Sequence, residues 1–273
     1  MSQIKLNQTS LNDFNVISNL LSSKIPFTFV RFSDGEMEVI RNEEFFIGDG
    51  KINWRKGSYN FDYPDFDKKE FLPSRDFNLR NDLLTAAMYK SGNFIKGIPA
   101  RHNSAISDRD SMIAFNGGNL ENLTFSDLFL NQNFLKFRRE IIPSFFHFES
   151  VFYFGNFRAK PENFRSSWVL VPVQDNFFQD YDAVVDKAIS ALMQVPRNSL
   201  ILSSASSLSN IVGHKLNSMR EDLTFLDIGT SLHDLVGLNS FIREYQMVLL
   251  PNNPKNIYRK IRLRLQKNNK LKW

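Results

Sequence analysis

Two carboxylate residues, Asp34 and Glu36, lie two positions apart where an apolar stretch of the chain ends. The stretch, residues 27–32, is rich in aromatic and β-branched side chains, which favours a buried strand. The following Ser33-Asp34-Gly35 is typical of a chain reversal. Carboxylate oxygens are hard ligands that suit Mg²⁺ or Mn²⁺, and Gly35 would free the backbone to turn between them. We therefore predict that Asp34 and Glu36 bind a divalent ion, which could in turn hold a diphosphate.

The same residues also match a second pattern, the capping box at the start of a helix. In a capping box the Ser33 hydroxyl would cap the helix and the Glu36 side chain would bond back to the backbone of Ser33. Neither carboxylate would then need a metal. The local sequence leaves both interpretations open, so residues elsewhere in the chain must decide between them.

Length and composition indicate a globular protein. The 273 residues suffice for one large α/β domain or two small ones, and 42% hydrophobic content with 27 phenylalanines supplies a core. The absence of cysteine excludes disulfides and thiolate metal sites, which leaves acidic, histidine or backbone ligands. The first residues lack the pattern of a signal peptide, and no window approaches about 18 uninterrupted apolar residues. We expect a cytoplasmic protein that does not span a membrane.

The positive net charge comes from the end of the chain. Eight of the 34 basic residues lie after residue 250 with no acid among them, and in the remainder acids outnumber bases. The charge therefore gives no reason to expect a specific nucleic acid partner. Residues 256–273 interleave apolar and basic side chains, which is typical either of a helix packed on the domain or of a peripheral contact with an anionic membrane at its inner face. We predict one domain over residues 1–250 and a basic segment over 251–273.

Hydrophobic periodicity predicts helices and strands in alternation. Helices are expected from residue 10 to before residue 26, and over residues 77–89, 181–194 and 208–216; apolar runs typical of strands cover residues 27–32, 94–99, 151–154, 168–173, 199–202 and 223–228. Residues 48–64 and 107–122, which contain Gly, Asn and other polar residues, are expected to be irregular. The alternation predicts an α/β fold with a Rossmann-like, mostly parallel sheet flanked by helices.

A turn of small residues, Ser203-Ser204-Ala205-Ser206, follows one predicted strand and precedes a predicted helix. At such a junction, free backbone N–H groups and the positive end of the helix can bind an anion, and serine hydroxyls add donors. The alternative is an ordinary serine-capped helix, since the turn lacks the glycine spacing of a P-loop or a dinucleotide fingerprint.

A third group of polar residues follows the last predicted strand. Asp227, Gly229 and Thr230 come directly after it, and His233 and Asp234 lie in the same loop. Because the carboxyl ends of parallel strands share one edge of a sheet, we expect this loop, the serine turn and the acidic turn to face one ligand site.

Three landmarks occur in order along the chain: Arg31-Phe32-Ser33-Asp34-Gly35-Glu36, Gly97-Ile98-Pro99 and Leu226-Asp227-Ile228-Gly229. In this order, over about residues 27–237, the chain resembles the GT-D-fold bacterial glycosyltransferases, which have an Arg-Phe-Gly-Asp-Gly-Glu-type turn, a Gly-Ile-Pro segment and an Asp-Ile-Gly segment. The chain departs from that pattern by having Ser33 for glycine, a serine turn for a loop with more glycine and proline, and Thr230 where the family often has histidine.

The resemblance implies a GT-D-type architecture and a transferase of polysaccharide biosynthesis. Such an enzyme moves a sugar from a nucleoside-diphosphate sugar to a carbohydrate, glycan or glycoconjugate acceptor. Asp34 and Glu36 would serve Mn²⁺ or Mg²⁺ and the diphosphate. Residues expected at the donor are Arg31, Ser33, Gly35, Ser203, Ser204, Ala205, Ser206, Asp227, Gly229 and Thr230. Asp234 and His233 are candidates for the base that accepts the proton of the acceptor hydroxyl.

Two other functions fit the same residues. A metal-dependent phosphohydrolase acting on a nucleotide or sugar phosphate would use the same ion to activate water. A non-enzymatic protein that binds carbohydrate or nucleic acid through the basic tail would keep its binding after loss of both turn carboxylates.

Overall fold

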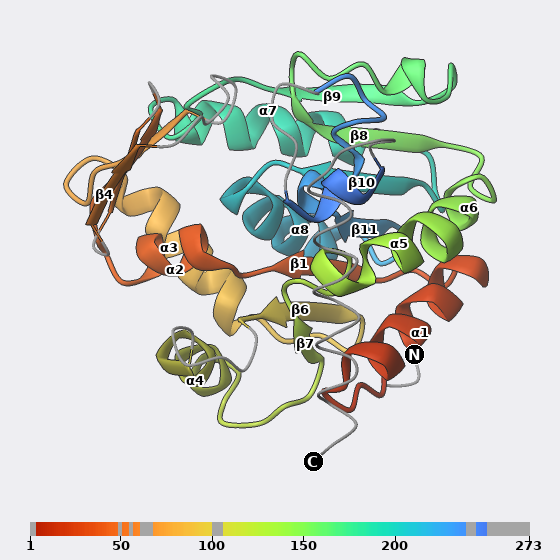
Figure 1. Cartoon of the computed structure of the whole chain (residues 1–273), viewed down its shortest axis with the longest axis horizontal. Helices are drawn as coiled ribbons and strands as arrows, with labels where there is room; N and C mark the ends of the chain where they lie inside the picture. Colours follow the sequence, from red (N-terminus) through yellow and green to blue (C-terminus); the bar gives the residue numbers. More distant parts are fainter. Residues whose placement is uncertain are drawn as a thin grey trace.

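The computed structural model describes residues 4–48, 51–54, 57–60, 68–99, 106–238 and 244–249. Its main sheet has seven strands, all parallel, in the order β7-β6-β1-β11-β10-β8-β9 (Figure 1). The strands are β1 (Thr28–Arg31), β6 (Phe94–Ile98), β7 (Leu123–Phe125), β8 (Val151–Asn156), β9 (Val169–Val173), β10 (Leu200–Ser204) and β11 (Thr224–Asp227). The predicted fold class, a parallel α/β sheet flanked by helices, is confirmed.

The central strands are buried on both faces, which explains why apolar side chains predominate in their sequences. In β1, Val30 belongs to one hydrophobic core and Phe29 to the other. In β11, Phe225 lies in the same core as Val30, and Leu226 lies in the same core as Phe29. The sheet therefore separates two cores, and its strands present alternate side chains to each.

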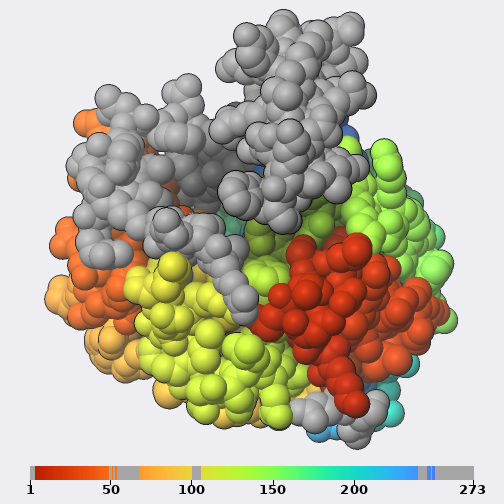
Figure 2. Space-filling view, turned by 60° about the horizontal axis from the view of Figure 1, so that its bottom comes forward, coloured from red at the N-terminus to blue at the C-terminus, as the bar shows by residue number. Residues whose placement is uncertain are grey.

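Helices cover both faces (Figure 1). One core is completed by side chains of α2 (Asp34–Ile40), α3 (Phe77–Met88), α4 (Ile106–Phe115), α7 (Tyr181–Met193) and α8 (Ser207–Met219). The other core is completed by α1 (Ser10–Ser22), α5 (Phe134–Lys136), the π-helical turn η4 (Phe137–Ile141) and α6 (Ile142–Phe145). Figure 2 shows α1 (red) beside the yellow-green chain around α4 and β7, which places these elements at one surface.

A second, four-stranded sheet corrects the prediction for residues 48–64. The described part of that segment forms β3 (Lys51–Trp54) and β4 (Gly57–Asn60), which join β2 (Phe45–Gly48) and β5 (Lys69–Phe71) in the antiparallel order β4-β3-β2-β5. Alternation of polar and apolar residues in β3 is the strand signal that the surrounding Gly and Asn obscured.

The expected loop over residues 107–122 was also wrong, because its first half is the helix α4. Gly117 has φ +72, and its N–H donates to the Ala114 carbonyl at 2.9 Å, while the Gly118 N–H donates to the Ile113 carbonyl at 2.9 Å. These are the bonds of a helix end closed by a left-handed glycine. The glycine pair therefore marks the end of a helix.

No helix in the described ranges combines the length and the apolar character needed to cross a bilayer. The basic segment 251–273, and with it the predicted membrane contact, lies outside the described residues.

Candidate functional site

The chain leaves the middle of the main sheet in two directions. After β1 it forms α2 on one face, whereas after β11 it forms the 3₁₀ turn η6 (Gly229–Leu232), whose Leu232 lies in the core of the other face. β1 and β11 are neighbours in the sheet. In open α/β sheets, ligands bind outside the carboxyl ends of the strands at such a switch point.

A buried ion pair between Arg31 and Asp227 joins the two strand ends at this point. Arg31 Nε lies 3.2 Å from Asp227 Oδ1, and Arg31 Nη1 donates to the Ser126 carbonyl at 3.1 Å. Burial raises the pKa of the Asp227 carboxyl, against the opposing effects of Arg31 and of the Gly229 N–H, which donates to Oδ1 at 2.9 Å. Burial by itself would lower the pKa of the Arg31 guanidinium. The nearby carboxylates of Asp227 and Glu36 have the larger combined effect, so the pKa of Arg31 is raised. The ion pair therefore keeps the Arg31 guanidinium charged and fixed in place at the carboxyl ends of β1 and β11.

Gly229 makes room for this guanidinium. Its φ is +49, and a Cβ built there would lie 2.1 Å from Arg31 Nη2. The sequence predicts that Gly229 contacts a donor; in the structure its neighbour is Arg31.

The acidic turn forms the capping box. The Ser33 N–H donates to Glu36 Oε2 at 3.0 Å, and the Ser33 hydroxyl donates to the same oxygen at 2.7 Å. Asp34, the first residue of α2, is exposed. Residues two apart on a helix do not face each other, so Asp34 and Glu36 do not form a ready-made pair of metal ligands. A Cβ on Gly35 would meet no atom within 4 Å, so packing does not require this glycine.

The acidic turn and the serine turn lie together, because the Ser206 hydroxyl donates to Glu36 Oε1 at 3.3 Å. Within the serine turn, the hydroxyls of Ser203 and Ser209 are 2.7 Å apart, and Ser209 Oγ accepts the Ala205 N–H at 3.1 Å. Ser203 is therefore a buried support of the turn and does not reach its surface.

Ser206 itself has φ 51 and ψ −141, a conformation close to one that is almost restricted to glycine. Holding a serine there costs about 1–3 kcal/mol, and such strain is concentrated at ligand clamps and active sites. Ser206 directly precedes the 13 residues of α8, whose positive end faces the ligand edge.

Replacement of Ser206 by glycine tests this strain. We expect Ser206→Gly to raise the free energy of unfolding by about 1 kcal/mol, since relief of strain exceeds the entropy that glycine loses on folding. Ser206→Ala, the matched control, keeps the strain and should give no gain. Urea denaturation of both variants measures the difference, and equal stabilities would mean that the turn is not strained.

The last loop also reaches this edge. His233 is buried, and its Nε2 lies 2.9 Å from the Ser204 hydroxyl. Asp234 instead forms an ion pair with Arg138 at 3.0 Å. Thr230 bonds through its hydroxyl to Tyr245, in the 3₁₀ turn η7 (Glu244–Leu249). Of the two proposed bases, only His233 bonds to the serine turn.

One residue at this edge was missed at the sequence level. Asn210 lies on the buried face of α8, and its Nδ2 donates to the Arg31 carbonyl at 2.9 Å. Its Oδ1 is buried and has no hydrogen-bond partner within the part of the chain that the structure describes. A polar side chain among the apolar positions of α8 is the signal that could have identified it.

No group of three or more acidic or histidine side chains suited to a metal occurs among the described residues. The parallel sheet defines an open α/β protein of Rossmann-like architecture. Its candidate ligand site lies at the switch point, at the carboxyl ends of β1 and β11.

Comparison with known proteins adds two distant structural similarities. No family model matches the chain, and no curated protein matches it. A structure described as a new glycosyltransferase (DUF1792) from Streptococcus sanguinis is 14% identical with a TM-score of 0.49, and the alignment covers 80% of each chain. A selenomethionine-substituted structure of a domain of unknown function 1792 is 12% identical with a TM-score of 0.44, over 82% of this chain and 83% of the other. At this level of similarity we infer no activity from either.

Proposed function

We propose that the protein is a glycosyltransferase of GT-D-type architecture. It transfers a sugar from a nucleoside-diphosphate sugar to a carbohydrate, glycan or glycoconjugate acceptor, as in polysaccharide biosynthesis. The observation that carries the proposal is the strained Ser206 turn at the start of α8, which bonds to Glu36, a carboxylate that also acts on the buried Arg31 at the switch point. This combination suits a ligand that carries phosphate groups.

The donor diphosphate would lie at the start of α8. Backbone N–H groups of the helix start that are not bonded within the turn, and the hydroxyl of Ser206, supply donors for its oxygens. Arg31 is held by Asp227, so its positive charge is already oriented before the donor arrives. Preorganised donors of this kind stabilise the charge that develops on a leaving diphosphate.

The acidic turn fits a divalent cation held with the help of the donor. Asp34 is exposed and has no ion-pair partner among the described residues, and Glu36 Oε1 receives only the 3.3 Å bond from Ser206. Two carboxylates and a diphosphate at one edge repel each other unless a cation lies between them, and Mg²⁺ commonly takes one or two carboxylates together with substrate phosphates. When bound, such an ion would neutralise charge on the leaving group.

His233 is the base in this proposal. The hydrogen bond between its Nε2 and the Ser204 hydroxyl places the imidazole where it can accept a proton passed on by that serine. Asp234 is neutralised by Arg138 and therefore does not compete for the proton. Residues 251–273 would bring the enzyme to acceptors on an anionic membrane.

A thermal-shift screen with nucleoside diphosphates and their sugars, each with Mn²⁺, Mg²⁺ or a chelator, tests the proposal. A ligand at about 100 times its dissociation constant stabilises the fold by about 2.7 kcal/mol, so a specific donor should raise the melting temperature by several degrees, and more with metal than with chelator. Transfer of the sugar to an acceptor must then be shown by product analysis.

Two results would contradict the proposal. Release of phosphate or nucleotide without sugar transfer to any acceptor would indicate the phosphohydrolase. Carbohydrate binding that is unchanged in Asp34→Asn and Glu36→Gln, with no turnover of any donor, would indicate a binding protein.

A further inference from the structure

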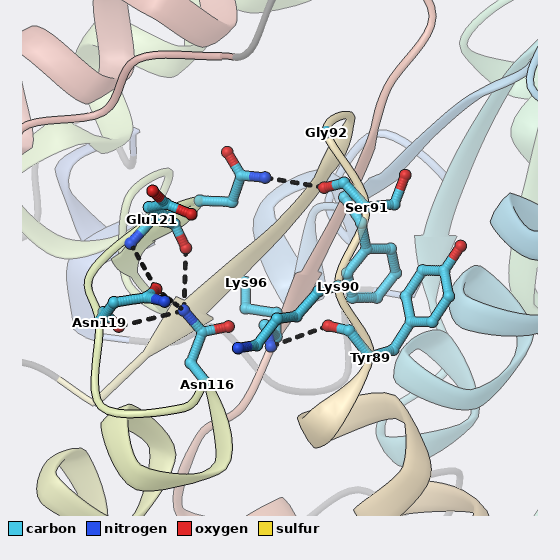
Figure 3. A pocket seen from close by; sticks show the side chains of 10 residues that line it. Tyr89, Lys90, Ser91, Gly92, Lys96, Asn116, Asn119 and Glu121 are labelled. Atoms are coloured by element: carbon cyan, nitrogen blue, oxygen red, sulfur yellow. Dashed lines mark hydrogen bonds between the residues drawn. The ribbon is translucent and has the colours of Figure 1, made fainter.

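A pocket of about 410 Å³ lies beside β6 and β7, away from the candidate ligand site; Figure 3 shows it from close by. It is lined by residues 89–92, which lead from α3 into β6, and by residues of the 116–122 segment, which lead from α4 into β7. Both segments precede strands, so the pocket is at the amino ends of β6 and β7. The candidate donor site is at the carboxyl ends, so the two sites are separate.

A buried lysine reaches this pocket from the middle of β6. Lys96 is 1% exposed, and its Nζ donates to the carbonyls of Ala87 at 2.8 Å and Tyr89 at 3.0 Å. These carbonyls end α3, so one role of the ammonium is to cap that helix. An ammonium has three N–H donors, and two bonds leave the third for the pocket.

A second ammonium, that of Lys90, lies beside the first. A Cβ built on Gly117 would be 2.4 Å from Lys90 Nζ, so Lys90 extends across to the segment after α4. Burial, and then the charge of Lys90, lower the pKa of Lys96 to about 8. Figure 3 shows the two amines together and the Glu121 carboxylate on the other side of the pocket. The two positive charges repel each other, and a bound anion would relieve this repulsion.

The pocket also contains an acceptor without a donor. Asn122 Nδ2 donates to the Ser91 carbonyl at 2.8 Å, which fixes the amide, and its Oδ1 is buried with no partner among the described residues. Asn116 differs, because its Nδ2 is bonded to Asn119 and to the Glu121 carbonyl within the loop. The Asn122 oxygen can therefore accept a hydrogen bond from a hydroxyl of a ligand.

We propose that this pocket binds a small phosphate ester that carries hydroxyl groups, such as a sugar phosphate. The phosphate lies at Lys90 and Lys96, and a hydroxyl donates to Asn122 Oδ1. A volume of about 410 Å³ is within the usual range for small-molecule sites and leaves room for a sugar beside the phosphate. The proposal does not depend on the proposed glycosyl transfer.

Isothermal titration calorimetry with glucose 1-phosphate, glucose 6-phosphate, inorganic phosphate and glucose tests the inference. At least one sugar phosphate should bind more tightly than inorganic phosphate, and glucose should bind least. Lys90→Glu should weaken binding of the phosphates by at least about tenfold, because it reverses a charge in contact with the anion. Lys187→Glu, the same charge change at an exposed position of α7, should have no effect.

Asn122→Gly tests the hydroxyl contact, although it also removes the bond from Asn122 Nδ2 to the Ser91 carbonyl. Glycine tolerates the φ of 54 found at Asn122, so the turn should persist. In this variant, the sugar phosphate should lose its advantage over inorganic phosphate while inorganic phosphate binds as before. Ser206→Gly, which alters the donor site, should leave both affinities unchanged. Equal binding by Lys90→Glu and wild type, or no preference for any sugar phosphate over inorganic phosphate, would overturn the proposal.

Discussion

Replacing Asp227 by alanine should lower the free energy of unfolding by about 3–5 kcal/mol, one of the largest effects expected of a single substitution in this chain. The change leaves the Arg31 guanidinium buried without its closest counter-charge, which lies 3.2 Å away in the native protein. It also removes the acceptor of the Gly229 N–H. Urea denaturation measures the loss.

Two variants make this measurement specific. Arg31→Met combined with Asp227→Ala removes both charges, so it should be less destabilised than Asp227→Ala alone. Arg197→Ala, which removes an arginine whose side chain is 89% exposed and 3.8 Å from Asp222, should change stability by less than about 0.5 kcal/mol. A loss below about 1 kcal/mol for Asp227→Ala would show that Arg31 does not depend on this carboxylate.

Asp34→Asn should lower kcat/KM for sugar transfer by at least about 100-fold and leave the melting temperature unchanged. The side chain is exposed, so its charge does little for the fold, while loss of a charged group at a developing diphosphate typically has an effect of this size. Asp186→Asn, on an exposed position of α7, is the matched control and should retain full activity.

Glu36→Gln separates the two interpretations of the acidic turn. Glutamine can replace glutamate in a capping box, so stability should fall by no more than about 1 kcal/mol. If Glu36 only caps α2, transfer should persist in this variant; if it also faces the metal and diphosphate, transfer should fall as in Asp34→Asn. Near-normal turnover in Asp34→Asn would remove the acidic turn from the proposed chemistry.

The main sheet was predictable because its strands are buried on both faces. Segments such as residues 199–202 and 223–228 are mostly apolar, a signal that does not depend on neighbouring elements. The meeting of the acidic turn, the serine turn and the last loop at one edge followed from parallel strand direction alone. The hydrogen bonds from Ser206 to Glu36 and between Ser204 and His233 are consistent with that expectation.

Other features depend on partners distant in sequence and gave no local signal. β2 is a strand because it pairs with β3 and β5, and Phe45 packs against Phe71 and Phe178 with ring centroids 6.0 Å apart in each case. The burial of His233 is another such feature, because the sequence does not show that the chain after β11 folds back over Ser204. The capping box was visible in the sequence as Ser33-Asp34-Gly35-Glu36, but a metal site formed by two carboxylates would have the same sequence pattern.

The contact between Gly229 and Arg31 links two positions that are far apart in the chain. The guanidinium occupies the volume in which any side chain at position 229 would begin, since a Cβ there would lie 2.1 Å from Arg31 Nη2. A larger residue at position 229 would therefore have to displace this guanidinium, and its φ of +49 would add backbone strain. Among relatives with this architecture, the two positions should vary together: arginine with glycine, or a short side chain with a larger partner.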